Sequence, residues 1–122
     1  MTLEQLTGYN PGDPADAETG MIEEICRAYK KPLKDLNDGE LWLLGSQQDG
    51  LPYILDVIWP KLVQDPLHCF ENYEGDLLSS LLRAPADLWA QRPEYEAELG
   101  ALKDRALAAP DYVKDMFIDS LI

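Results

Sequence analysis

With 122 residues, of which 46% are apolar and 27% are charged, the chain has the size and composition of one globular domain, which argues against disordered and fibrous classes. Its 23 acidic and 10 basic side chains give a formal net charge of −13, so nucleic acid and anionic membranes would be repelled as direct partners. The charge favours a basic partner, although acidity also promotes solubility and does not by itself separate these two roles.

Helical periodicity dominates the chain, and no segment alternates convincingly with period two. Residues 7–19 are rich in Gly, Pro and Asp and are expected to form an irregular loop. The following segment predicts a helix that ends before Pro32, because a residue that precedes proline avoids the α region. The apolar side of this helix consists of Met21, Ile22, Ile25, Cys26 and Tyr29.

A capping box predicts where the next helix begins. Asn37 stands three residues before Glu40 and ahead of an apolar run, so a helix is expected from about Asp38 to Gln48, with Gly50 ending it. Between the two helices, Leu33 and Leu36 are expected to plug a short connector.

The strongest periodic segment begins at Leu51. Its apolar side chains recur on one face of a helix and are expected in the core. They are Leu51, Ile54, Leu55, Ile58, Trp59, Leu62 and Val63. Pro60 lies inside this helix and removes the hydrogen bond to the Asp56 carbonyl, so we predict that the central helix kinks or splits there.

The second half of the chain predicts further short helices. Asp76 is expected to cap a helix that carries four leucines. Pro85 suits the first turn of another helix, which Pro93 restarts, and Asp111 begins a final helix. The apolar side of that final helix consists of Tyr112, Val113, Met116, Phe117 and Leu121. Together the segments predict an all-α fold, a single compact domain of about six helices over residues 1–122.

The cysteines and the N-terminal sequence indicate a reducing compartment. A secreted scaffold of this size would carry more cysteines than Cys26 and Cys69, and Cys26 falls on an apolar helix side where a buried, reduced thiol is expected. The N-terminus lacks the organisation of a signal peptide, and no apolar run approaches the ~20 residues that span a bilayer. We therefore expect a soluble cytoplasmic protein.

Residues suited to catalysis are few. His68 is the only histidine, and an ordinary loop histidine is favoured over a general base that works with the adjacent Cys69. The acids Asp13, Asp16 and Glu18 lack the ligand spacing of a calcium loop, and no glycine pattern indicates a nucleotide. We predict a non-enzymatic protein without metal or cofactor; a small hydrolase that uses His68 and an adaptor subunit of a larger assembly are the alternatives.

An ordered set of residues between Pro32 and Trp89 resembles one family of immunity proteins from bacterial contact-dependent growth inhibition systems, the CdiI family. The set consists of Leu36, Leu41, Leu43, Leu44, Gln47, Gly50, Leu51, Tyr53, Leu55, Leu62, Pro66, Leu67, Tyr73, Gly75, Asp76, Leu77, Leu78, Leu81, Leu82 and Trp89. The run from Pro32 to Leu36 fits the entry to this pattern. The chain departs from the pattern in its proline, which is expected near Asp56 and stands at Pro60, so the kink should lie one turn later.

The resemblance implies a non-catalytic inhibitor. Such proteins bind the C-terminal toxin domain of a large effector delivered by neighbouring cells, and that toxin is often a nuclease. A nuclease needs a basic cleft to hold phosphates, and an acidic protein complements it. The residues that we expect to contact the toxin are acids outside the helical stripes and two tyrosines, namely Asp49, Tyr53, Asp56, Glu71, Tyr73 and Glu74. The tryptophans Trp42, Trp59 and Trp89 lie in predicted helices, where core packing is favoured over partner contact.

Overall fold

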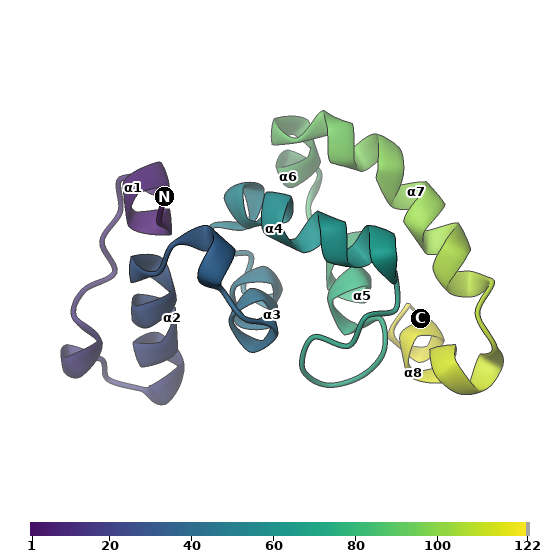
Figure 1. Cartoon of the computed structure of the whole chain (residues 1–122), viewed down its shortest axis with the longest axis horizontal. Coiled ribbons are helices and arrows are strands. Elements are labelled where there is room, and N and C mark those ends of the chain that lie inside the picture. The colour runs from purple at the N-terminus through teal and green to yellow at the C-terminus, as the bar shows by residue number, and fades with distance from the viewer. Residues whose placement is uncertain (122) are drawn as a thin grey trace.

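The computed structural model describes residues 1–121, which form eight α-helices and two short 3₁₀ helices but no strand (Figure 1). The α-helices are α1 (Leu3–Thr7), α2 (Gly20–Lys30), α3 (Asp38–Ser46), α4 (Leu51–Gln64), α5 (Asp76–Leu82), α6 (Ala86–Gln91), α7 (Pro93–Leu107) and α8 (Asp111–Ser120). The 3₁₀ helices are η1 (Pro14–Asp16) and η2 (Leu33–Asp35). The predicted all-α fold is confirmed.

The helix count exceeds the predicted six for two local reasons. The sequence analysis missed α1, a five-residue helix that begins with a capping box between Thr2 and Gln5. It also treated the segment from Pro85 to Arg105 as one helix with a restart. Arg92 has φ −133° and ψ 62°, outside the helical region, because it precedes Pro93, so α6 and α7 are separate helices.

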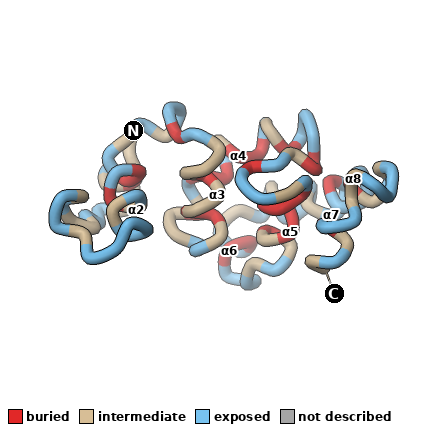
Figure 2. Tube along the Cα trace, turned by 90° about the horizontal axis from the view of Figure 1, so that it is seen from below, coloured by how far each residue is buried: buried red, intermediate tan, exposed pale blue. Residues whose placement is uncertain are grey.

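The core is built around α4. Six of its side chains are buried, as the periodicity predicted: Leu51, Ile54, Leu55, Ile58, Trp59 and Leu62. The helix continues through Pro60, so the predicted split is wrong; the predicted kink stays a prediction. Figure 2 shows the buried residues concentrated in the middle of the molecule, on α3, α4 and α5.

The turn between α3 and α4 differs from its prediction. The capping box of Asn37 and Glu40 begins α3 as expected, but the helix ends at Ser46. Gln48 and Gly50 then take left-handed conformations, with φ of 55° and 65°. Gly50 therefore precedes α4 as its N-cap instead of ending α3, and a side chain there would meet Leu3 of α1.

Five apolar side chains that were predicted to face the core are exposed, and these predictions were wrong. They are Met21, Ile22, Val63, Tyr112 and Met116. Two of the three helices that carry them bury only a narrow stripe: α2 buries Cys26, Ala28 and Tyr29, and α8 buries Phe117. The apolar stripe of each helix is wider than the face that its neighbours cover.

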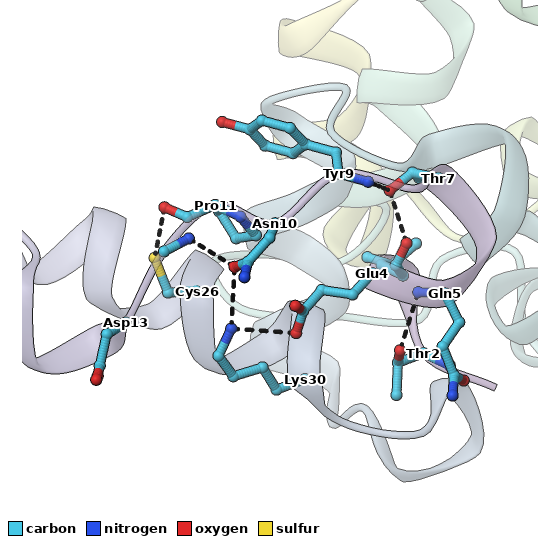
Figure 3. Close-up of polar contacts among 12 residues, drawn as sticks. Thr2, Glu4, Gln5, Thr7, Tyr9, Asn10, Pro11, Asp13, Cys26 and Lys30 are labelled. Atoms are coloured by element: carbon cyan, nitrogen blue, oxygen red, sulfur yellow. Dashed lines mark hydrogen bonds and ion pairs between the residues drawn. The ribbon is translucent and has the colours of Figure 1, made fainter.

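The N-terminal segment is held against α2 by polar contacts (Figure 3). Lys30 Nζ lies 3.1 Å from Glu4 Oε2 and 3.3 Å from Asn10 Oδ1, so it ties α1 and the following loop to α2. The buried thiol of Cys26 donates to the Pro11 carbonyl at 3.6 Å. Apart from η1, the loop over residues 8–19 has no regular structure.

None of the helices formed by residues 1–121 combines the length and the hydropathy needed to cross a bilayer.

Candidate protein-interaction surface

A groove lies between α2, α3 and the loop of residues 65–75 that joins α4 to α5. Its volume is about 400 Å³, and its walls are Glu24, Asn37, Gly39, Glu40, Trp42, Leu43 and Glu71. These residues come from three separate segments of the chain, which the fold brings together. We call this surface the α2–α3 groove.

Trp42 and Leu43 provide the apolar part of the α2–α3 groove. Helix α3 buries Leu41, Leu44 and Gly45 against the core, and Trp42 lies beside this buried stripe, half-buried and packed against the edge of the core. The rest of its indole forms part of the groove wall. A large aromatic ring in this position offers apolar contact area to a partner with little loss of conformational freedom.

Three carboxylates line the groove together with these apolar side chains, and they differ in their partners within residues 1–121. Glu40 Oε1 accepts from the Asn37 backbone N–H at 3.0 Å, and the Glu40 carboxylate pairs with Lys31 Nζ. Within residues 1–121, neither Glu24 nor Glu71 forms an ion pair with a lysine or arginine. The groove therefore presents uncompensated negative charge beside an aromatic side chain.

Asp76 shapes the loop that carries Glu71. Its buried carboxylate accepts backbone N–H bonds from Phe70 at 3.1 Å and from Glu71 and Asn72 at 2.9 Å, and Leu77 donates a fourth at 2.7 Å. The prediction that Asp76 is an N-cap was wrong in position: Gly75, with φ 82°, is the N-cap and Asp76 begins α5. The carboxylate thus organises the preceding loop as well as the helix start.

Gly39 leaves the space into which Glu71 extends. A Cβ atom built on Gly39 would lie 2.9 Å from Glu71 Oε2, closer than ordinary side-chain contacts allow. The loop fixed by Asp76 and the missing side chain at position 39 together place the Glu71 carboxylate at the start of α3.

The predicted contact residues fall into two separate groups. Glu71, Tyr73 and Glu74 lie in the 65–75 loop, and Glu71 lines the α2–α3 groove. The second group consists of Asp49, Tyr53 and Asp56, of which Tyr53 is an exposed residue in the first turn of α4. Both acids of this group have partners within the chain. Asp49 accepts from the Tyr29 hydroxyl, and Asp56 lines a different groove with Trp59, Tyr95 and Glu98.

Asp56 is held by two side chains from the α6–α7 region. Arg92 Nη2 lies 2.6 Å from Asp56 Oδ1, and the Tyr95 hydroxyl donates to the same oxygen. The Arg92 hydrogen bond lowers the pKa of the Asp56 carboxyl below its ordinary value. Burial and, to a smaller extent, the hydrogen bond to Asp56 raise the pKa of Tyr95 to about 12. Because Asp56 and Asp49 already have partners within the chain, they are less available for contact with another molecule than Glu71 or Glu74, whose carboxylates have no such partners within residues 1–121.

Sequence reasoning missed Glu24 and Glu40 as surface candidates and assigned Trp42 to the core. The buried states of Trp59 and Trp89 agree with the core prediction, whereas Trp42 is only half-buried. One sequence signal could have identified Trp42 as a surface residue. Helix α3 is apolar on nearly every side, but a helix of nine residues packs only one face against the core, so some of its apolar side chains must lie at the surface.

His68 forms a polar contact with an acid outside its own loop. Its Nε2 lies 2.7 Å from Asp38 Oδ2, and its ring packs edge-on against Phe70 with 4.6 Å between the centroids. Burial, with the negative charges of Asp76 and Glu74, raises the pKa of the neighbouring Cys69 thiol. A raised pKa lowers the thiolate fraction that a nucleophilic cysteine requires. No group of three potential ligands within residues 1–121 is arranged for a metal ion.

The described residues form an all-helical protein with an acidic groove that Trp42 lines. Residues 5–99 match a family model described as CDI immunity proteins, where CDI is contact-dependent growth inhibition. The chain therefore belongs to the CDI immunity proteins. Immunity proteins bind a cognate toxin protein and are normally non-enzymatic. Searches of curated proteins and of solved structures found no match.

Proposed function

We propose that this protein neutralises the C-terminal toxin domain of a cognate contact-dependent growth inhibition effector by binding it in the cytoplasm through the α2–α3 groove. The observation that carries the proposal is a groove lined by the half-buried Trp42 together with Glu24 and Glu71, two carboxylates without basic partners in the described chain. Aromatic anchors with a charged rim are typical of protein interfaces.

The charge of the groove supports a basic toxin, and a nuclease is the class that we favour. A nuclease holds phosphates with Lys and Arg side chains, so its active-site surface is positive. The net charge of −13 would attract such a surface at long range, and Glu24 and Glu71 would meet it at contact. Glu74 and Tyr73 in the same loop are further proposed contacts; Asp49, Tyr53 and Asp56 would belong to the interface only if the toxin also reached α4.

Co-expression tests the function directly. Expression of the C-terminal toxin domain of the cognate effector should arrest bacterial growth, and co-expression of this chain should restore it. Continued arrest, with both proteins present in soluble form, would exclude the proposed neutralisation.

Charge reversal in the groove is expected to slow association. The double variant Glu24→Lys with Glu71→Lys should lower the association rate constant about 10-fold at 50 mM salt, because the groove would repel a basic surface. The difference should shrink at 500 mM salt, where the Debye length is a few ångströms. Association can be followed by biolayer interferometry with a catalytically inactivated toxin domain.

The matched control is Glu96→Lys with Asp104→Lys, which changes the net charge equally at two exposed positions of α7. This control should slow association much less than the groove variant. Equal slowing by both pairs would show that net charge acts without a groove.

His68→Ala separates the binding role from the alternative hydrolase role. The His68–Asp38 pair suggests a base held by an acid, which is the geometry that a hydrolase reading would use. We expect neutralisation to persist in His68→Ala, with a stability loss of about 1 kcal/mol or less, because the pair is partly exposed. Growth rescue by wild type and variant, together with their melting temperatures, measures both effects. Loss of rescue in a folded His68→Ala protein would favour catalysis.

A further inference from the structure

Helix α8 presents an outward face that the core does not use. Tyr112 is 85% exposed and Met116, one turn later, is 57% exposed. Asp115 and Asp119 are exposed and occupy the neighbouring positions, so the four residues follow the i, i+3, i+4, i+7 spacing of a single helix face. We call them the α8 patch.

The opposite face fixes α8 next to the loop that carries Glu74. Phe117 is fully buried, and its ring lies 2.7 Å from where a Cβ atom of Gly75 would stand. Ser120 Oγ and Ser79 Oγ share a hydrogen bond of 2.6 Å, which joins α8 to α5. In Figure 1 the 65–75 loop lies between α3 and α8 along one edge of the molecule. The α8 patch is therefore carried on a docked helix beside the proposed toxin contacts.

Charge decides between the possible occupants of the α8 patch. Its charged members are both acidic, and Lys114, the one base of α8, is engaged by the Leu107 carbonyl and lies 3.5 Å from Asp111. A two-fold interface between copies of this chain would bring Asp115 and Asp119 of both copies together, where they would repel. A basic protein surface with an apolar centre complements the patch.

The family model gives a second, independent reason to treat α8 separately. The match ends at residue 99, so all of α8 lies outside the part of the chain that matches the family model. We infer that the α8 patch is a second contact with the basic toxin domain, one that selects the partner of this chain; the inference rests on the proposed function.

Removal of the two apolar side chains tests the inference. The double variant Tyr112→Ser with Met116→Ser should weaken binding of the inactivated C-terminal domain of the cognate effector by about 10-fold or more, mainly through faster dissociation. Its melting temperature should stay close to that of wild type, because both side chains are exposed. The matched control is Tyr9→Ser with Val63→Ser, which removes two exposed apolar side chains elsewhere and should leave the Kd unchanged.

Three outcomes would overturn the inference in distinguishable ways. An unchanged Kd for the α8 variant, with tight binding by wild type, would remove α8 from the interface and leave the groove proposal intact. A wild-type dimer in light scattering that the α8 variant converts to a monomer would assign the patch to a second copy. Absence of binding by wild type would overturn the proposed function and this inference together.

Discussion

Asp76→Ala is expected to lower the free energy of unfolding by about 4 kcal/mol and to weaken toxin binding as well. The buried carboxylate accepts four backbone N–H groups, and its removal would leave them without a protein acceptor. The three donors from the loop would then turn toward water, so Glu71 would lose its fixed place in the α2–α3 groove. Urea denaturation followed by circular dichroism measures the stability loss.

Two further variants sharpen the Asp76 result. Asp76→Asn should lower the free energy of unfolding less than Asp76→Ala, because the amide keeps one acceptor oxygen. It should still be destabilising, because its NH₂ group would face the backbone N–H groups that now donate to the second carboxylate oxygen. Asp104→Ala, at an exposed position of α7, should stay within about 0.5 kcal/mol of wild type. Equal stability of Asp76→Ala and Asp104→Ala would contradict the role assigned to the buried carboxylate.

Phe117→Ala is expected to destabilise the protein by about 3–5 kcal/mol, the usual cost of removing a buried phenylalanine. Phe117 has no exposed surface, and its ring, like the Leu67 side chain, lies close to Gly75 at the base of the 65–75 loop. The loss would include both the transfer of the ring from the core and the cavity left below the loop. Thermal and urea unfolding of the purified variants measure it.

A double-mutant cycle with Gly75 tests the contact itself. Gly75→Ala alone should be destabilising, because the position has φ 82° and the new methyl group would meet Phe117. In the Phe117→Ala background the clash with Phe117 is relieved, while the backbone strain and the close contact with Leu67 remain. The two costs should therefore fall short of additivity by at least about 0.5 kcal/mol. Gly100→Ala, at an open helical position, should be neutral or stabilising. Strict additivity would mean that α8 does not pack at Gly75.

Local patterns predicted the helices well because each depends on residues close in sequence. The capping box at Asn37, the apolar face of α4 and the proline-marked starts all act within one or two turns. Burial depends on neighbours that sequence does not display. Val63 and Met116 follow their apolar stripes, yet no other element covers them.

The candidate site was less predictable because long-range contacts define it. Asp49 was predicted to be available for partner contact, but the fold places the hydroxyl of Tyr29, 20 residues away in sequence, against its carboxylate. Asp56 meets Arg92 across 36 residues. The α2–α3 groove combines Glu24, the start of α3 and Glu71, and no local spacing relates these three segments. Of the predicted contact residues only Glu71 lines this groove; it was proposed, with Tyr73 and Glu74, from the general rule that loops on a rigid scaffold carry recognition.

The contact between Phe117 and Gly75 restricts how α8 can be exchanged. The outward side chains Tyr112 and Met116 are exposed, but the inward face of α8 must fill a space beside Leu67 and Gly75, which lie within the residues that match the family model. A chimera that received a different helix in place of α8 would therefore inherit a packing problem unless the residues at positions 67 and 75 were changed to match. Surface substitutions on α8 leave this packing intact, while exchange of the whole helix demands matched changes beneath it.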